Sequence, residues 1–235
     1  MAKTTNTPVR RLLVVVLIAA AVKVVLIKLG WHPPSLFAGN VNHFDFDIEW
    51  NRVVPSIVLW IIFSVYWIIA SRNSAESRSS ESRGSAAFHQ LVLSAALILL
   101  FWAAPGLKGW FLPQRFHFLV VVGASVQAGF ILLAVWARRH LGSNWAAEVR
   151  IGVDHQLVRT GPYRWLRHPI YTAMLGMFLG TAIASSQYHA LVGLAMLVLA
   201  YLRKTRLEEQ ILFHTFGGDF DAYRRDTWAL VPLVY

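Results

Sequence analysis

Two short polar stretches near the C-terminal end of the chain carry side chains that could bind a charged small molecule. The first is "GPYRWLRHPIY", residues 161–171, in which His168 precedes Pro169. Proline is favoured at the first position of a helix, where its missing N–H costs nothing, so His168 is predicted to be the N-cap. A helix N-terminus attracts an anion, and Arg167 with His168 strengthens that preference. The first stretch therefore suits a carboxylate-bearing group.

The second stretch is "YLRKTRLEEQILFHTF", residues 201–216, which places Glu208 and Glu209 beyond an apolar run. Only two apolar runs separate the stretches, at about 170–185 and 190–202, and "SQYH" joins them. So short a connection makes the two runs antiparallel neighbours, so the end of the second returns to the start of the first. We expect the acidic pair to lie beside His168. A site that pairs carboxylates with an anion-attracting helix end suits a zwitterion such as an amino acid.

The elements that position these residues are predicted to be membrane-spanning helices. Of the 235 residues, 56% are hydrophobic and 14% are charged, and the mean hydropathy of +0.49 exceeds that of an ordinary soluble domain. A spanning helix needs about 20 mainly apolar residues. Six candidates occur, at about 9–29, 53–70, 88–104, 116–137, 170–185 and 190–202. The sequence predicts an all-α, polytopic membrane helical bundle of about six transmembrane helices with a C-terminal cytoplasmic cofactor site.

Basic residues predict how the bundle is oriented. Of the 22 Lys and Arg residues, 17 lie before or at the start of the first run, after the last run, or in residues 71–87 and 138–167. Only Arg52, Lys108 and Arg115 flank the opposite side. The positive-inside rule therefore places both termini in the cytoplasm. We interpret the formal charge of +10 as topology and attraction to membrane lipid, with no nucleic-acid partner.

Composition also predicts the domain organisation. The stretch "SRNSAESRSSESRGS", residues 71–85, is a Ser-rich linker. We predict an amino-terminal two-helix membrane region with this linker over residues 1–87, and a four-helix core with the cytoplasmic pocket over residues 88–235. No cysteine is present, which excludes disulfides, thiolate catalysis and zinc-thiolate sites.

A third polar stretch, "NVNHFDFDIEW", covers residues 40–50. Its His43, Asp45, Asp47 and Glu49 alternate along the chain, so a strand or extended loop would place them on one face, where they could hold a cation. We favour an amphipathic segment at the membrane interface, and no metal site is predicted.

The polar stretches, taken in order, resemble a known family. "HQLVRTGPYRWLRHPIY", a short helical hairpin and "EEQILFHTFGGDFDAYRR" together resemble the membrane methyltransferases of the isoprenylcysteine carboxyl methyltransferase and phospholipid N-methyltransferase superfamily. The resemblance covers about residues 140–230. It implies a binding site for S-adenosylmethionine, whose methionine end is a zwitterion. By that resemblance the cofactor-binding residues are His155, Gln156, Leu157, Val158, Tyr163, His168, Pro169, Ile170, Tyr171 and Glu208.

The resemblance also implies direct methyl transfer from a sulfonium to a lipophilic or small membrane-soluble acceptor, which is a carboxylate, an amine or a thiol. Such a displacement needs chiefly proximity and orientation. In the carboxyl methyltransferases a basic residue four positions before the glutamate is associated with the substrate carboxylate, and here that position is Lys204. Arg203 or Lys204 could hold an acceptor carboxylate. An amine or thiol acceptor would need a base, for which His168, His214 and Glu209 are candidates.

Two other functions stay open. Sterol and steroid reductases share a similar C-terminal helical arrangement but bind a nicotinamide dinucleotide such as NADPH, although the smaller donor fits these residues better. A non-catalytic membrane scaffold would leave the crowding of polar groups unexplained. Structural roles are also open: Arg164 and Arg167 as interfacial anchors, and Glu208 and Glu209 as partners of Arg203 and Arg206. We expect the final segment, from "FGGDF" onward, to bend at Gly217 and Gly218 and to cover the cofactor with its aromatic side.

Overall fold

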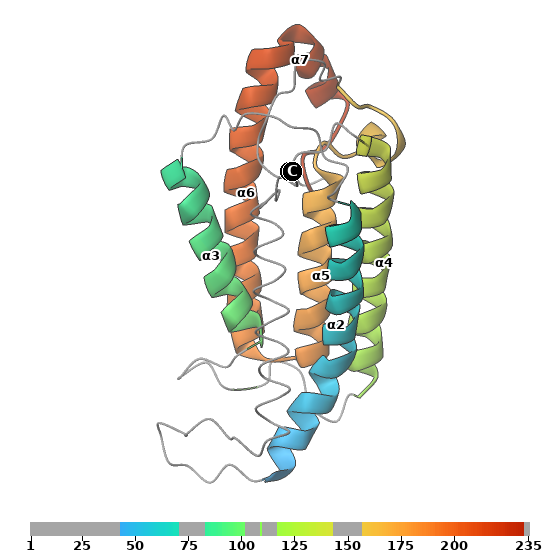
Figure 1. Ribbon diagram of the computed structural model, residues 1–235, viewed down its shortest axis with the longest axis vertical. Helices are drawn as coiled ribbons and strands as arrows, with labels where there is room; N and C mark the ends of the chain where they lie inside the picture. The colour runs from blue at the N-terminus through green and yellow to red at the C-terminus, as the bar shows by residue number, and fades with distance from the viewer. Residues whose placement is uncertain (1–42, 71–82, 102–108, 110–116, 143–156, 233–235) are drawn as a thin grey trace, which may run out of the picture.

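The computed structural model describes residues 43–70, 83–101, 109, 117–142 and 157–232, and the structural statements below concern those residues. They form a bundle of helices (Figure 1). The only β-pairing among them is one isolated bridge, between Leu166 and Trp228. The helices are α2 (His43–Ala70), α3 (Arg83–Phe101), α4 (Phe118–Leu141), the short 3₁₀-helix η3 (Gly161–Arg164), α5 (Pro169–Ser185), α6 (Tyr188–Phe216) and α7 (Gly218–Arg225).

Five of the six predicted apolar runs fall wholly or largely within the described part of the chain, and there each run is helical over nearly all of its described residues. The all-α prediction is therefore confirmed for these residues. The first run, residues 9–29, lies outside them. The helix α6 has 29 residues and continues beyond the predicted apolar run, which ends at about residue 202. This continuation carries Glu208 and Glu209 away from the apolar part of the bundle while keeping them on a helix.

The stretch around residues 40–50 differs from its prediction. Residues 43–50 form the beginning of α2 rather than a strand or an extended loop. Residues two positions apart do not share a face of a helix. The helix therefore excludes the extended arrangement in which His43, Asp45, Asp47 and Glu49 would line one face, an arrangement that we considered but did not favour.

The helices are arranged around α5 and α6 (Figure 1). α3 lies against α6, whereas α2 and α4 pack against α5. The crossing of α4 and α5 depends on small residues: a Cβ atom on Gly180 would lie 2.6 Å from the carbonyl oxygen of Gly123. Glycine allows such close backbone approach between membrane helices. α2 is joined to α5 by the Trp60 indole, which donates a 3.0 Å hydrogen bond to Oγ1 of Thr181.

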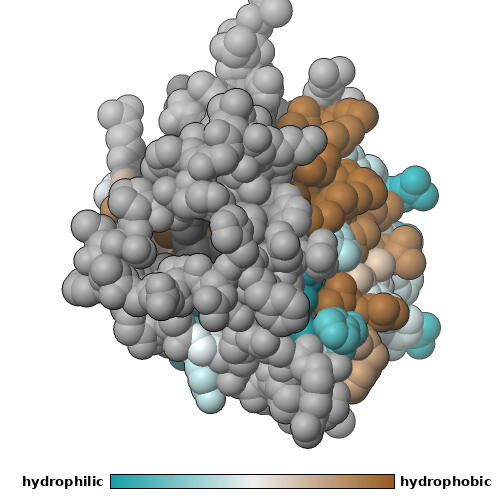
Figure 2. All heavy atoms as spheres, turned by 90° about the horizontal axis from the view of Figure 1, so that it is seen from below, coloured by the Kyte–Doolittle hydropathy of each residue, from teal (hydrophilic) through white to brown (hydrophobic). Residues whose placement is uncertain are grey.

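Two helical segments are long and apolar enough to cross a membrane, Arg52–Ala70 and Phe118–Leu141. Ala87–Leu100 and Pro169–Ser185 are shorter apolar helices. Large apolar side chains point outward from several helices; Leu91, Leu132 and Leu199 are 67%, 71% and 67% exposed. Figure 2 shows apolar side chains dominating the outer side of the described part. Apolar surface on this scale is typical of lipid contact, and the chain is an integral membrane protein.

The turns at the two ends of α6 bring its polar end to the start of α5. Ser186 ends α5 in the left-handed conformation with φ of +56°, and its N–H donates to the carbonyl of Ala182 at 2.8 Å. Gly217 ends α6 with φ of +51°, a conformation that favours glycine, and α7 follows directly. The predicted bend is therefore confirmed at Gly217, whereas Gly218 is the first residue of α7.

Candidate functional site

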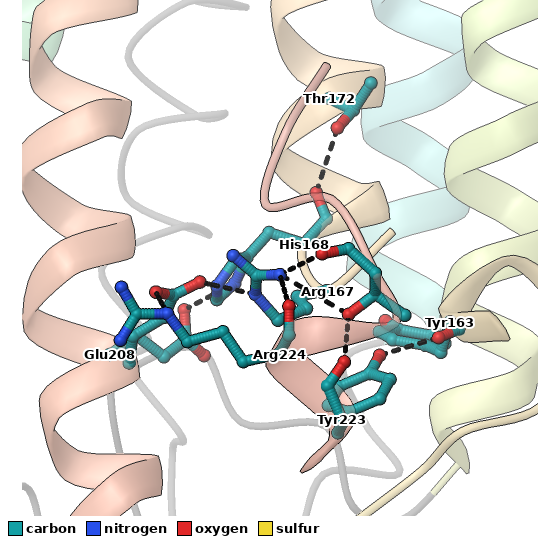
Figure 3. A network of polar contacts seen from close by, with 9 residues as sticks. Tyr163, Arg167, His168, Thr172, Glu208, Tyr223 and Arg224 are labelled. Atoms are coloured by element: carbon teal, nitrogen blue, oxygen red, sulfur yellow. Dashed lines mark hydrogen bonds and ion pairs between the residues drawn. The ribbon is translucent and has the colours of Figure 1, made fainter. Parts of the chain in front are cut away.

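His168 occupies the position that the sequence predicts, as the N-cap of α5, with Pro169 as the first helical residue. Its carbonyl oxygen accepts the backbone N–H of Thr172 at 3.1 Å, which is the first turn of the helix. The imidazole makes no capping hydrogen bond. The ring is 5% exposed and turns toward α6 instead (Figure 3).

Both nitrogens of the His168 ring face carboxylates on α6. Nδ1 lies 3.5 Å from Oε2 of Glu208, and Nε2 lies 3.4 Å from Oε1 of Glu209. The hairpin of α5 and α6 therefore brings the acidic pair and the His-Pro cap together, as expected. The two distances exceed the usual range of hydrogen bonds, about 2.7 to 3.2 Å. Within the described residues, His168 Nε2 and Glu208 Oε2 are buried without a hydrogen-bond partner.

Arg167 ties Glu209 to the end of the chain. Its Nε donates to Oε1 of Glu209 at 2.7 Å, and its Nη1 donates to the carbonyl oxygens of Arg224, at 3.1 Å, and of Thr227. The Arg167 side chain is only 8% exposed, so it is not the lipid-facing anchor that was one of its possible roles. Glu209 likewise pairs with Arg167 rather than with Arg203 or Arg206. The exposed Arg224 adds a longer contact, with its Nε 3.9 Å from Oε2 of Glu209.

Residues 227–230, which we call the C-terminal strap, run alongside the loop that carries His168. The backbone N–H groups of Arg167 and His168 donate to the carbonyl oxygens of Trp228 and Ala229, at 2.8 and 3.1 Å. Thr172 Oγ1 donates to the carbonyl of Leu230 at 2.6 Å (Figure 3). The strap thus occupies the N–H groups of Arg167 and His168, which precede the first helical residue, Pro169.

Aromatic rings form the walls of the site. The His168 ring stacks on Tyr171, with centroids 5.5 Å apart and planes 9° apart, and Tyr171 in turn contacts Tyr201 at 5.2 Å. Tyr223 of α7 donates its hydroxyl to the carbonyl of Tyr163 at 2.6 Å, so α7 covers η3. Burial raises the pKa of the Tyr163 hydroxyl, which keeps it neutral. The predicted cofactor residues Tyr163, His168 and Tyr171 therefore lie in one region.

The charges in the site stabilise one another. Burial alone would raise the pKa of Glu209, but His168 and Arg167 outweigh it and lower that pKa to about 2. Burial likewise opposes ionisation of Glu208, yet His168, Tyr171 and Lys204 lower its pKa. Burial would lower the pKa of His168, but the two carboxylates raise it above its ordinary value. Both carboxylates are ionised at neutral pH, and the imidazole is biased toward its charged form.

The other predicted site residues do not all lie near His168. Arg203 donates to Oγ of Ser85 at 2.5 Å and lies over the ring of Phe88, so it contacts α3 rather than His168. Lys204 is buried one turn before Glu208 on α6. Pro169 is buried and Leu157, Val158 and Ile170 are half-buried, whereas His155 and Gln156 lie outside the described residues.

Sequence reasoning missed the polar partners that hold the site together. Thr172 and Thr227 were not predicted, and Arg167 had no assigned partner. A threonine one turn after a helix start is a weak signal, because its hydroxyl often bonds within its own helix; Thr172 also lies 3.2 Å from the carbonyl of His168. Nothing local in the sequence indicates that the strap returns to residues 165–168.

The region that contains the site is similar to a known protein family. Residues 118–219 match the model of the phospholipid methyltransferase family, a range that includes His168, Glu208 and Glu209 but ends before the strap. This match supports the superfamily that the sequence resembles.

Two methyltransferases of that superfamily show the extent of the similarity. Protein-S-isoprenylcysteine O-methyltransferase A of Arabidopsis thaliana is 28% identical over 139 residues, 58% of this chain and 66% of that protein. The human protein-S-isoprenylcysteine O-methyltransferase is 31% identical over 117 residues, 49% of this chain and 39% of that protein. The match thus spans less than two thirds of either relative. A solved structure of the eukaryotic intramembrane Ras methyltransferase ICMT aligns with 97% of this chain at 15% identity and a TM-score of 0.49.

Proposed function

We propose that the protein is an integral-membrane methyltransferase that transfers a methyl group from S-adenosylmethionine to a lipophilic or small membrane-soluble acceptor. The observation that carries the proposal is the cluster of His168, Glu208 and Glu209 at the polar end of α5 and α6. It lies inside the region that matches the phospholipid methyltransferase family.

Glu208 is the residue best suited to hold the ammonium of the donor. Its Oε2 is buried without a hydrogen-bond partner among the described residues, although its side chain keeps 28% exposure. A carboxylate in this state can accept a charge-assisted hydrogen bond from a ligand. Tyr163 and Tyr171 would line the bound donor, together with Pro169 and Ile170. We also assign His155, Gln156, Leu157 and Val158 to the donor site; of these, Leu157 and Val158 belong to the described residues that precede η3.

The donor supplies an electrophilic methyl group on a sulfonium, and the protein supplies position. A carboxylate acceptor is already ionised at neutral pH, so it needs a cation to hold it rather than a base. Lys204, buried one turn before Glu208, is placed for that role, whereas Arg203 contacts α3. Glu209 is poorly suited as a base because its pKa is about 2. Its bond to Arg167 gives it a positioning role.

We extend the proposal to topology and domains. The chain would cross the membrane six times with both termini in the cytoplasm, and residues 88–235 would form the methyltransferase core behind an amino-terminal region of residues 1–87. A reporter fused after Tyr235 should then be active in the cytoplasm. Activity of that reporter only outside the cytoplasm would overturn the topology.

Calorimetry on the detergent-purified full chain tests the donor. S-adenosylmethionine and its demethylated product should bind, and NADPH should not. Binding of NADPH alone would favour a reductase, and binding of none of the three would favour a scaffold. The acceptor is then found by incubating membranes with a donor that carries an isotopically labelled methyl group and following the label into lipids and small thiols by mass spectrometry.

A further inference from the structure

The placement of the His168 ring restricts its protonation state. Nδ1 faces a carboxylate oxygen of Glu208 at 3.5 Å, and Nε2 faces one of Glu209 at 3.4 Å (Figure 3). A neutral imidazole has one N–H and one lone pair, so in either tautomer a lone pair would face a negative oxygen. Only the imidazolium presents a hydrogen to both carboxylates. The geometry therefore favours a charged His168 in the ligand-free protein.

Other cations already lie near both carboxylates. Glu209 already bonds to Arg167 at 2.7 Å and has Arg224 at 3.9 Å, and Lys204 lies one turn before Glu208. Of the basic side chains near Glu208 and Glu209, His168 is the one of a type that ordinarily changes its charge near neutral pH. Three titratable groups lie against the His168 ring: Glu208, Glu209 and Tyr171. The other titratable or charged groups interact with the two carboxylates, and they are Tyr163, Arg167, Lys204, Tyr223 and Arg224.

We propose that His168 is a charge placeholder, which releases one proton when the ammonium of the methyl donor binds to Glu208. The inference rests on the proposed function. The Nδ1–H bond of the imidazolium breaks, its electron pair stays on nitrogen and the proton passes to the buffer. The ammonium then donates to Glu208, and the remaining Nε2–H still faces Glu209. The number of positive charges beside the two carboxylates is the same before and after binding.

This exchange makes His168 a determinant of specificity for the amino-acid end of the ligand. A ligand without an ammonium has no cation to offer in place of the proton. Methylthioadenosine, which keeps the adenosine and loses the amino-acid end, should bind without proton release. The demethylated product keeps the ammonium and should release a proton as the donor does. Below the pKa of His168, donor affinity should fall about tenfold for each unit of pH, because the proton then competes with the ligand.

Calorimetry of the full chain in detergent counts the protons. S-adenosylmethionine is titrated at pH 6.5 in phosphate and in Bis-Tris, buffers with very different enthalpies of protonation. The difference in binding enthalpy should correspond to release of about one proton. Donor binding with equal enthalpy in both buffers would overturn this inference and leave the methyltransferase proposal intact. Absence of donor binding in either buffer would overturn both.

Variants identify the residue that releases the proton. His168→Gln keeps a polar side chain that cannot titrate, and it should abolish both proton release and the dependence of affinity on pH. Arg164→Gln is the matched control, since Arg164 is exposed in the same loop; it should leave proton release unchanged. If His168→Gln abolishes binding, nitrogen-15 NMR of the histidine rings in the wild-type chain decides. A His168 signal that changes from imidazolium to neutral on donor addition supports the exchange, and an unchanged signal contradicts it.

Discussion

The two ends of the helical bundle both bury charged or polar side chains, yet they use them differently. At the end where α5 turns into α6, Arg52 and His189 are buried. At the other end, where α6 continues toward α7, His168 and Glu209 are buried. The difference lies in the groups that these four side chains contact.

At the turn between α5 and α6, side chains satisfy backbone and side-chain oxygens. Arg52 donates to the carbonyl of Ala184 at 3.2 Å and to Oγ of Ser186 at 3.1 Å. The His189 ring contacts the carbonyl of Leu99 at 2.6 Å and Oε1 of Gln187. These contacts cap the last turns of helices, whose final carbonyls otherwise lack partners. We conclude that polar groups at this end stabilise the bundle.

At the end that holds the site, several buried atoms stay unpaired within the described part of the chain. They are Nε2 of His168, Oε2 of Glu208 and Oγ1 of Thr205. Unpaired buried polar atoms cost stability, so a cluster of them in a native protein needs an explanation. For Oε2 of Glu208, the proposed ammonium of the donor supplies one. The comparison therefore separates residues that hold the fold from residues that bind, and the variants below test that separation.

Arg52→Met should have the largest effect, and it should affect stability alone. The variant removes the donor for two buried oxygens, and each unsatisfied acceptor costs about 1 to 3 kcal/mol, so unfolding should become easier by about 2 to 4 kcal/mol. Thermal unfolding in detergent measures the loss, with the exposed Arg164→Met as the matched control. Weaker donor binding at an unchanged melting temperature would contradict the assignment of this end to stability.

Glu208→Gln should give the converse result. The variant keeps the shape of the side chain but removes the charge that we pair with the ammonium of the donor. A hydrogen bond to a charged group is worth about 1.5 to 3 kcal/mol, so donor affinity should fall about tenfold to more than a hundredfold. Calorimetry measures it, and the exposed Asp226→Asn is a control for lost negative charge. Unchanged affinity at an unchanged melting temperature would remove Glu208 from the site.

Arg167→Lys tests the link between the site and the C-terminal strap. Lysine lacks the planar fork with which Arg167 contacts Glu209 and two carbonyl oxygens at once. We expect the free energy that holds the strap in place to fall by about 1 to 2 kcal/mol, which should make hydrogen exchange at residues 227–230 faster. Donor affinity should also fall, but by less than in Glu208→Gln. Arg164→Lys is the control. Unchanged exchange in the strap would show that Arg167 does not hold it.

The sequence predicts the helices and the meeting of His168 with the acidic pair for a simple reason. Apolar runs mark the helices, and four residues between two runs oblige them to lie side by side. The apolar run stops at about residue 202, but α6 itself continues to Phe216. The helix continues because Glu208 and Glu209 find partners in Arg167 and His168, which come from another part of the chain.

The sequence does not show the direction in which each side chain points. Arg52 was expected to flank the membrane on the side opposite the site, as a basic residue at the end of an apolar run does. The structure buries it against the turn after α5, because the rotation of α2 about its own axis points it inward. Packing against α4 and α5 fixes that rotation. The position of the strap cannot be predicted for a related reason, because its partners lie about 60 residues earlier in the chain. The contact between Arg167 and Thr227 is an example.

Thr172→Val should have the smallest effect and should sharpen the boundary between the two kinds of residue. Thr172 Oγ1 donates to the carbonyl of Leu230 at 2.6 Å, so it holds the strap without facing His168 or the carboxylates. Valine keeps the shape of the side chain and removes one neutral hydrogen bond, worth about 0.5 to 1.5 kcal/mol. Hydrogen exchange at the amides of the strap should quicken modestly, while calorimetry should show the same donor affinity as the wild type.

Thr181→Val is the control in the core of the bundle. Thr181 accepts the indole N–H of Trp60, so the substitution should lower the melting temperature without changing hydrogen exchange in the strap. A Thr172→Val chain that lost donor affinity as strongly as Glu208→Gln would show that the strap belongs to the binding site rather than to its support.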